Sequence, residues 1–389
     1  MLSPHLESNY VDKRIDHDSF APVGTKGIIS IEERPMQITI PENAWPAGLK
    51  PVVQKISNHS PGSRINGPVG ETCDTLIITY TTDETRALSY VFTGDVHFED
   101  SWYKYCHGFD KIKPKITNGL ELKGKPTTLG SGILGFLLPV KIGNQKAVLY
   151  KSELHPARNG KELPILDMVQ QLVNDLSPKL VITSGTGGAV GKKVQLGDAV
   201  ITGSALFLCK HQYPDDSNIN SMSKNKEAIT NDVSVANKYI DYANEKLTLL
   251  ISPGLLSDIE KLKSKFQIDW VKNNDSPKIY SKNVPSAVNM NVISADYFSI
   301  DDSKDTEGLQ EMGVMNDMDD AFVAFAINQI KGSKPQWLSI RNASEPEIKF
   351  QDDEKAMKDN ASNIYDICGY HTSFSSSFAS WAVIAGMQN

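Results

Sequence analysis

From Asp74 onward, short apolar runs rich in β-branched residues alternate with segments whose apolar residues recur at helical spacing. Runs of this kind are expected to be buried strands, and the segments between them are expected to be helices. Strands that alternate with helices form a largely parallel or mixed sheet that is covered on both faces. The fold class expected is therefore α/β: a three-layer sandwich around a central twisted mixed sheet.

The boundaries of these elements follow from the same patterns. The expected strands are 76–80, 147–151, 179–184, 196–208, 291–298 and 336–341. The expected helices are 82–92, 163–176, 319–330 and 376–386. Ligands in such folds bind beyond the carboxyl ends of the strands, so the residues that follow each strand are the candidates for a functional site.

Two parts of the chain break the alternation. Residues 1–72 contain eight prolines, which exclude long helices, and they are expected to form an extended, non-helical arm or linker. The remainder, 73–389, is expected to be the catalytic domain. Within it, residues 212–288 are polar and read as an insertion with two surface helices, over 233–251 and from Ser252-Pro253 onward.

Charge and composition exclude several classes of protein. The net charge is −7 and the basic residues are mixed with acidic ones, whereas a nucleic-acid binder needs a clustered Lys/Arg surface. The longest strongly apolar run, 133–140, is far shorter than the ~20 residues of a membrane helix, and the N-terminus lacks an apolar signal region. The four cysteines form no Cys-x-x-Cys pair. We expect a cytoplasmic protein that binds neither nucleic acid nor membrane.

Two motifs that suggest a cofactor or a metal do not fit their context. Residues 130–135, GSGILG, match the dinucleotide fingerprint, but that fingerprint needs a strand before it and a helix after it, and FLLPV follows here. Asp301, Asp302 and Asp305 match no calcium loop and are expected to lie in a solvated loop. No organic cofactor and no metal are expected.

Acidic residues follow several of the expected strands. Glu84 stands three residues after Thr81, which fits a capping box in which Glu84 bonds only the backbone. Asp317 and Asp319 precede an apolar helix, where acids are ordinary caps, although a carboxylate can also accept two ribose hydroxyls. Glu345 ends a strand, in a loop that the next residue, a proline, stiffens.

The glycine-rich segment 184–190, SGTGGAV, directly follows a strand. Its glycines, Gly185 and Gly187 among them, would let the backbone approach a ligand closely, and successive N–H groups would bind an anion. A tight turn between two strands is the alternative interpretation.

These segments, in this order, resemble the nucleoside phosphorylase/nucleosidase superfamily, above all its methylthioadenosine/S-adenosylhomocysteine nucleosidase branch. The resemblance covers about 74–201 and 289–386, and SGTGGAV followed by LGDAVI is similar to the glycine-rich strand-turn and GD(I/V)V strand of that family. It implies hydrolysis of the N-glycosidic bond of a purine nucleoside or nucleotide, with adenine as the expected base. It also implies a homodimer.

The resemblance assigns a role to each acidic motif. In TDETRAL (82–88), Glu84 would position the water nucleophile. In DMDDA (317–321), Asp319 would hold the ribose hydroxyls. In RNASEP (341–346), Glu345 would be the general acid, kept protonated by burial.

The remaining candidate residues would bind the substrate. Phe298, at the end of ISADYF, would stack on the base, and Met318 would pack near base and sugar. Thr186 and neighbouring N–H groups would line the sugar side, and His155 and Arg158 would meet the 5′ group. The other members of the predicted site are Asp317, Gly185, Gly187 and Ser344.

Departures from the family pattern leave alternatives open. The family acid is usually Asp where this chain has Glu345, and its ribose ligand is usually Glu where this chain has Asp319. Each exchange moves a carboxylate by about one methylene, and roughly 1 Å is enough to impair catalysis unless a shifted substrate satisfies both. A catalytically weak nucleoside-binding sensor module is therefore one alternative.

A phosphate-dependent purine nucleoside phosphorylase is the other alternative. The phosphorylases resembled here place an Arg where this chain has Thr183, and a Gly in the loop after the first strand, where this chain has TTDE. An acid such as Glu84 beside the nucleophile repels phosphate and suits water. Hydrolysis is therefore favoured over phosphorolysis.

Overall fold

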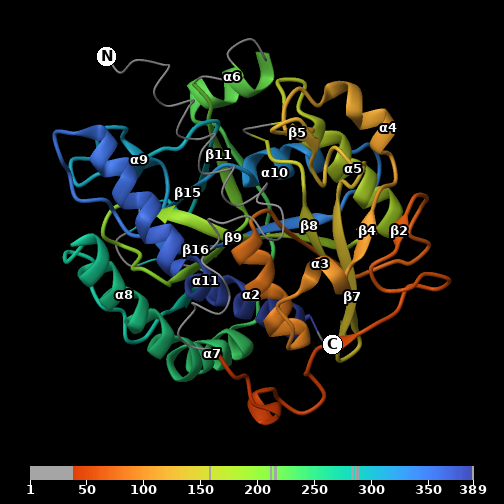
Figure 1. The fold of residues 1–389 in the computed structure, drawn as a ribbon, viewed down its shortest axis with the longest axis horizontal. Helices are drawn as coiled ribbons and strands as arrows, with labels where there is room; N and C mark the ends of the chain where they lie inside the picture. Colours follow the sequence, from red (N-terminus) through yellow and green to blue (C-terminus); the bar gives the residue numbers. More distant parts are fainter. Residues whose placement is uncertain are drawn as a thin grey trace.

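The computed structural model describes residues 38–387 except 157–158, 211–212, 214–216, 282–283, 285–286 and 288. Within these residues, fourteen strands join in one mixed sheet with helices on both faces (Figure 1). The predicted α/β fold class with a central mixed sheet is confirmed. None of the described helices is long and apolar enough to cross a membrane.

Four neighbouring parallel strands form the middle of the sheet. In spatial order they are β8 (Gln145–Ser152), β3 (Thr75–Thr79), β9 (Leu180–Ala189) and β16 (Gln336–Glu345). β9 extends beyond the end of β3. Its last residues pair with β15 (Met315–Asp317), which lies beside β14 (Val292–Ala295). The carboxyl ends of all these strands meet in one region, as the sequence predicts.

Helices cover both faces because the strands are apolar on both sides. One face is covered by α5 (Pro164–Leu176), α6 (Ser217–Asn225) and α10 (Asp320–Asn328). The other is covered by α2 (Thr82–Thr93), α7 (Asn237–Lys246) and α11 (Glu354–Gly386). In β3, Leu76 and Ile78 pack on the first side and Ile77 on the second, as the twofold periodicity of a strand requires.

Shorter elements complete the chain. They are η2 (Glu42–Ala44), β1 (Val52–Val53), β2 (Arg64–Ile65), α3 (Phe98–Ser101), β4 (Tyr103–Tyr105), α4 (Phe109–Ile112), η3 (Lys113–Lys115), β5 (Glu121–Leu122), β6 (Lys125–Pro126), β7 (Gly135–Ile142), β10 (Ala199–Thr202), β11 (Ser204–Leu208), β12 (Ala228–Thr230), η4 (Leu247–Ile251), α8 (Ser252–Phe266), β13 (Ile279–Tyr280) and α9 (Leu309–Met312).

Several boundaries differ from the prediction. The strand expected at 196–208 is two strands, β10 and β11, which pair with different neighbours. The break falls at Gly203, where a Cβ would lie 2.2 Å from the carbonyl oxygen of Asn231, so only glycine fits. The segment 130–135 leads into strand β7, so the helix that the dinucleotide fingerprint needs after it does not follow here.

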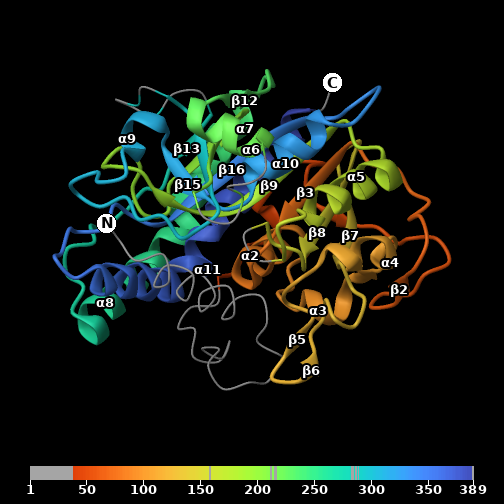
Figure 2. The same cartoon turned by 90° about the horizontal axis from the view of Figure 1, so that it is seen from above.

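The segment read as a polar insertion packs against the domain. The predicted helix at 233–251 is α7 followed by one π-helical turn, η4, and α8 begins at Ser252 as predicted. α8 lies alongside α11 in both views (Figures 1 and 2). The described part of the predicted arm contains only a 3-10 turn and two short strands, which pair with β7 and β4 at the sheet edge.

The carboxyl-terminal helix α11 begins at Glu354, far before the predicted start at 376. Its middle is rich in Ser, which is a poor helix former. Ser373 and Ser377 donate to carbonyls one turn earlier, and Ser380 donates to Ser184 of β9 at 2.9 Å. These small side chains satisfy their hydroxyls while the helix packs closely on the sheet, so tertiary packing overrides local propensity.

Candidate functional site

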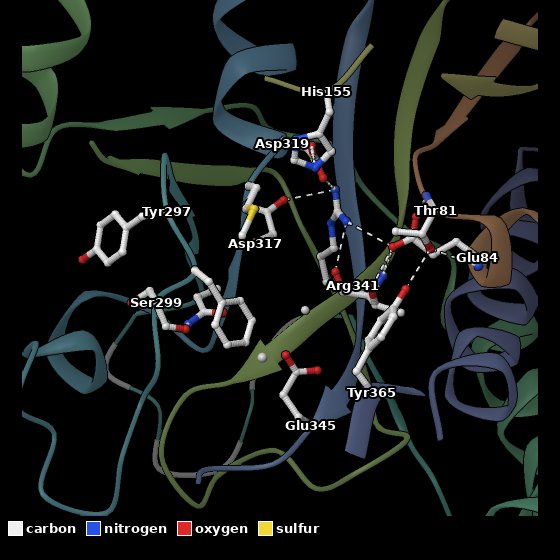
Figure 3. A pocket seen from close by; sticks show the side chains of 16 residues that line it. Thr81, Glu84, His155, Tyr297, Ser299, Asp317, Asp319, Arg341, Glu345 and Tyr365 are labelled. Atoms are coloured by element: carbon white, nitrogen blue, oxygen red, sulfur yellow. Dashed lines mark hydrogen bonds and ion pairs between the residues drawn. The ribbon is translucent and has the colours of Figure 1, made fainter. Parts of the chain in front are cut away.

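A cavity opens where the central strands end (Figure 3). About 620 Å³ of empty space, including solvent at its open mouth, lies between its walls. The residues that line it are Thr81, Glu84, His155, Thr186, Gly187, Gly188, Tyr297, Phe298, Ser299, Asn316, Asp317, Met318, Asp319, Arg341, Glu345 and Tyr365. The three predicted catalytic carboxylates, which are far apart in sequence, therefore share one hollow.

Arg341 of β16 lies at the centre of the acidic wall. Its guanidinium binds Asp320 through Nε, 3.0 Å from Oδ2, and through Nη2, which contacts Oδ1. The same Nη2 is 3.0 Å from Asp317 and 3.5 Å from Asp319, and Nη1 is 3.9 Å from Glu84. All of these side chains are buried. One positive charge thus faces four carboxyl groups, of which Figure 3 shows those of Asp317, Asp319 and Glu84.

Arg341 affects the pKa values of the neighbouring carboxyl groups to different extents. Burial and the nearby Asp320 raise the pKa of Asp317, and burial raises the pKa of Asp319 despite Arg341. Burial alone would also raise the pKa of Asp320, but the two-point contact with Arg341 outweighs it and lowers that pKa. Asp320 is therefore the permanent partner of the arginine, and Asp317 and Asp319 take up protons more readily than ordinary aspartates.

Asp319 directs one oxygen towards a partner that was not predicted. Its Oδ1 lies 3.2 Å from Nε2 of His155, which is an ion-pair distance. The geometry is not that of a hydrogen bond, and Oδ1 accepts no hydrogen bond from any described residue. A buried carboxylate oxygen in this position can accept a hydroxyl hydrogen from a ligand.

Glu84 is held by four donors. Oε2 accepts the N–H groups of Tyr80 and Thr81, at 3.0 and 2.9 Å, and the capping box of α2 is present as predicted. Oε1 accepts both the N–H and the hydroxyl of Thr186, each at 2.7 Å. These bonds use all the acceptor positions of a carboxylate, so Glu84 ties α2 to β9 and reaches the cavity through Thr186.

The glycine-rich segment is a strand and not a turn. Gly185, Gly187 and Gly188 lie in β9, paired with β16, so the tight turn considered from the sequence is not present. Glycine is needed because neighbours approach closely: a Cβ at Gly185 would lie 2.5 Å from the carboxyl group of Glu84. The anion bound by the Thr186 N–H is the chain's own Glu84.

Glu345 stands at the last residue of β16 and faces the cavity apart from the arginine cluster (Figure 3). The register between β16 and β9 shifts between Ala343 and Glu345, and such irregularities re-aim side chains beside sites. Ser344 does not line the cavity, but its hydroxyl contacts Oε2 of Glu345 and the carbonyl oxygen of Gly187. Ser344 thereby orients the carboxyl group.

The opposite wall is formed by the segment after β14 and by β15 with the residue that follows it. Phe298 and Met318, the predicted base-binding residues, both line the cavity. Asn316 donates from Nδ2 to the carbonyl oxygen of Ser299 at 3.0 Å, which fixes the backbone beside Phe298. Arg158, predicted to meet a 5′ group, lies outside the described residues.

Seven of the lining residues are not among the predicted site residues: Thr81, Gly188, Tyr297, Ser299, Asn316, Arg341 and Tyr365. Arg341 and Asn316 each stand near a strand end, a position that marked their neighbours as candidates, so this signal was present for both. Tyr365 comes from α11, and its hydroxyl donates to Oγ1 of Thr81 at 3.0 Å. No sequence pattern places this turn of α11 beside the cavity.

The acidic segment near residue 301 is not solvated, which contradicts the prediction. Asp301 and Asp302 are only 4% and 3% exposed, because backbone and side-chain donors bind them there. Burial, with smaller contributions from Asp305 and Glu347, raises the pKa of Asp301 to about 8. Among the described residues, no group of three His, Cys, Asp or Glu side chains is arranged to hold a metal ion.

The fold and the cavity define an α/β protein with an acidic cavity at the strand ends. No family model and no curated protein matches the sequence. Among solved structures, the chain is similar to the 5′-methylthioadenosine/S-adenosylhomocysteine nucleosidase of Neisseria meningitidis in complex with methylthio-immucillin-A. The TM-score is 0.41 at 11% identity, over 81% of this chain and 100% of that one.

Two further solved structures show the same degree of similarity. The corresponding nucleosidase of Colwellia psychrerythraea, in complex with adenine, has a TM-score of 0.43 at 11% identity, over 82% of this chain and 96% of that one. Futalosine hydrolase of Helicobacter pylori has a TM-score of 0.41 at 11% identity, over 81% and 97%. These proteins are nucleosidases, the class that the sequence motifs resemble.

Proposed function

We propose that this chain hydrolyses the N-glycosidic bond of a purine nucleoside or nucleotide and releases the free base, with adenine as the expected base. The observation that supports this most directly is that Glu84, Asp319 and Glu345 line one cavity together with Phe298. Acidic groups on different walls of one cavity suit a reaction in which a bound sugar becomes positively charged. A cytoplasmic homodimer is part of the same proposal.

Asp319 is the proposed ligand of the ribose hydroxyls. Its buried Oδ1 accepts no hydrogen bond from a described residue and therefore suits a hydroxyl donor. A carboxylate at this place also stabilises positive charge that develops on the sugar ring. Met318 would pack against the sugar and base, and Phe298 would stack on the base.

Glu345 is the proposed general acid. In its protonated form it donates to N7 of the base while the bond between C1′ and N9 breaks, and the electron pair of that bond leaves with the base. The base then departs as a neutral molecule. Ser344, which contacts Oε2, keeps the carboxyl group turned towards the cavity.

Thr186 and Glu84 are the proposed route for the proton of the attacking water. The hydroxyl of Thr186 donates to Glu84 and leaves its own oxygen free to accept a proton from a water molecule in the cavity. As the water oxygen bonds to C1′, its proton passes to Thr186 and the Thr186 proton passes to Glu84. Glu345 loses one proton and Glu84 gains one, and exchange with solvent restores both.

Water is the favoured nucleophile over phosphate. The cations that line the described cavity are Arg341 and, when protonated, His155, and Arg341 already binds Asp320 at two points. A phosphate ion would have to lie beside several carboxyl groups, which repel it. Phosphorolysis is therefore the weaker candidate, as the sequence also indicates.

A nucleoside-binding module is the second candidate function. It is favoured by the four hydrogen bonds that Glu84 already accepts, since a carboxylate satisfied by protein donors holds no water directly. A base-release assay separates the candidates: adenosine, methylthioadenosine, S-adenosylhomocysteine, AMP and ATP are each incubated with the protein in phosphate-free buffer. Release without phosphate supports the nucleosidase. Release only with added phosphate supports the phosphorylase, and saturable binding without release supports the binding module.

A further inference from the structure

Asp319 is held from two sides. Arg341 approaches Oδ2 through Nη2 at 3.5 Å, which is longer than its contacts with Asp320 and Asp317. His155 approaches Oδ1 through Nε2 at 3.2 Å (Figure 3). His155 is therefore the nearer of the two basic groups that face Asp319, and Arg341 is also shared with Asp317 and Asp320.

His155 is itself fixed in place. It follows β8, and the side chain of Asn159 accepts its backbone N–H. Its ring meets the edge of Tyr80, with 5.8 Å between centroids and 73° between planes. Tyr80 is only 2% exposed. The imidazole of His155 therefore lines the cavity and packs against the buried ring of Tyr80.

The surroundings of Asp319 are rich in acidic groups. Its acidic neighbours are Asp317 of β15, Asp320 of α10 and Glu84 of α2. Tyr80, which follows β3, is also close and carries no positive charge. Burial together with these charges raises the pKa of Asp319. When protonated, the imidazole 3.2 Å from Oδ1 favours the ionised form of Asp319, which accepts hydroxyl hydrogens.

We infer that His155 is a positioning residue: it holds the Asp319 carboxylate in the orientation that accepts the sugar hydroxyls. This inference rests on the proposed function and reassigns His155, which the sequence predicted at the 5′ group. The two assignments differ in a measurable way. A positioning residue for Asp319 affects ligands through their 2′ and 3′ hydroxyls, whereas a 5′ ligand affects them through the 5′ substituent.

The test compares His155→Ala and His155→Gln with the wild-type chain. Binding is measured calorimetrically and base release is measured separately, each with adenosine, 2′,3′-dideoxyadenosine and 5′-deoxyadenosine. His107→Gln is the matched control, because His107 lies 2.7 Å from Asp175 and neither residue lines the cavity. Circular dichroism confirms that each variant is folded.

For His155→Ala we expect adenosine and 5′-deoxyadenosine to bind about tenfold more weakly, because Asp319 loses the contact that fixes its Oδ1. Dideoxyadenosine, which has no diol, should bind with nearly unchanged affinity. Glutamine, which also offers an N–H, should restore most of the loss. His107→Gln should behave as wild type.

Three results would overturn the inference. They are equal weakening of adenosine and dideoxyadenosine, loss that disappears with 5′-deoxyadenosine, and no loss at all. If His155→Ala does not fold, the same ligands are compared with His155→Gln. Its smaller loss of affinity must still occur only with ligands that have the 2′ and 3′ hydroxyls. A wild-type chain that binds adenosine through its diol but releases no base would refute the proposed hydrolysis and leave the role of His155 standing. No binding of any nucleoside would refute both.

Discussion

The guanidinium of Arg341 and the carboxylate of Asp320 meet at two points, with Nε 3.0 Å from Oδ2 and Nη2 in contact with Oδ1. The hydroxyl of Ser339 adds a further contact to Oδ2. The pair joins β16 to the first residue of α10, directly after Asp319. The stability of the fold and the placement of a site carboxylate therefore depend on the same contact.

Replacement of Asp320 by Ala should destabilise the fold strongly. It leaves the buried Arg341 without its main partner, and removal of one member of a buried pair typically costs about 3–5 kcal/mol. Urea unfolding measures the change. Lys179→Ala is the control, because Lys179 meets Asp74 with its side chain 77% exposed and a surface pair of this kind contributes little to stability. Equal losses in the two variants would contradict the assignment of Asp320 as the permanent partner.

Replacement of Glu345 by Gln should reduce base release by about 10²–10⁴-fold, because glutamine cannot donate the acid proton. Binding of the substrate should change much less. Single-turnover release of adenine, measured alongside calorimetric binding, separates the two effects. Glu260→Gln, on a side chain that is 68% exposed, provides a matched control of unchanged rate. Equal release by wild type and Glu345→Gln would remove Glu345 from the mechanism.

Replacement of Gly185 by Ala tests why β9 contains glycines. The new Cβ would lie 2.5 Å from the Glu84 carboxyl, so Glu84 must move and lose its bonds to Thr186. Overpacking of this kind costs about 1–3 kcal/mol, and thermal unfolding would detect it. At Gly67 a Cβ meets nothing within 4 Å, so Gly67→Ala should be neutral. A Gly185→Ala variant with unchanged stability and base release would show that the close approach is not required.

The pH dependence of stability should change when Asp301 is replaced by Asn. Burial raises the pKa of Asp301 in the folded chain to about 8, from the ordinary value of 3.8. The folded state therefore binds the proton more tightly than the unfolded state, and this group lowers stability as pH rises from about 4 to about 8. Asparagine does not titrate, so the variant should gain stability relative to wild type across that range.

Urea unfolding at several pH values measures this difference directly. Ile300→Val, a neighbouring substitution without a titrating group, should differ from wild type by a constant amount. If the difference between Asp301→Asn and wild type is also constant between pH 4 and pH 8, the raised pKa is refuted.

Much of this protein could be predicted locally. Apolar runs and helical spacing gave the strands and helices around the site, because a residue's own neighbours determine whether it alternates with a twofold or a 3.6-fold period. Glu84 and Glu345 follow or end such a run and Asp319 precedes an apolar helix, and the family resemblance assigned a role to each. The capping box of Glu84 was likewise visible as a spacing of three residues, and the structure contains it.

Other features depend on packing between distant segments. The length of α11 was underestimated because its serines are poor helix formers, and only the sheet beneath them supplies a reason for a close, small-residue contact. The glycines of β9 were compatible with a turn until β16 paired with them and Glu84 occupied the space beside Gly185.

The amino-acid sequence by itself determined the α/β class and the positions of the acidic residues along the chain, because periodicity and strand ends are local properties. The tertiary structure alone decided which groups share a charge. Arg341 is the common partner of four carboxyl groups, His155 contacts Asp319, and Tyr365 donates to Thr81. These contacts join residues that are distant in sequence, and only the folded sheet and helices bring them together.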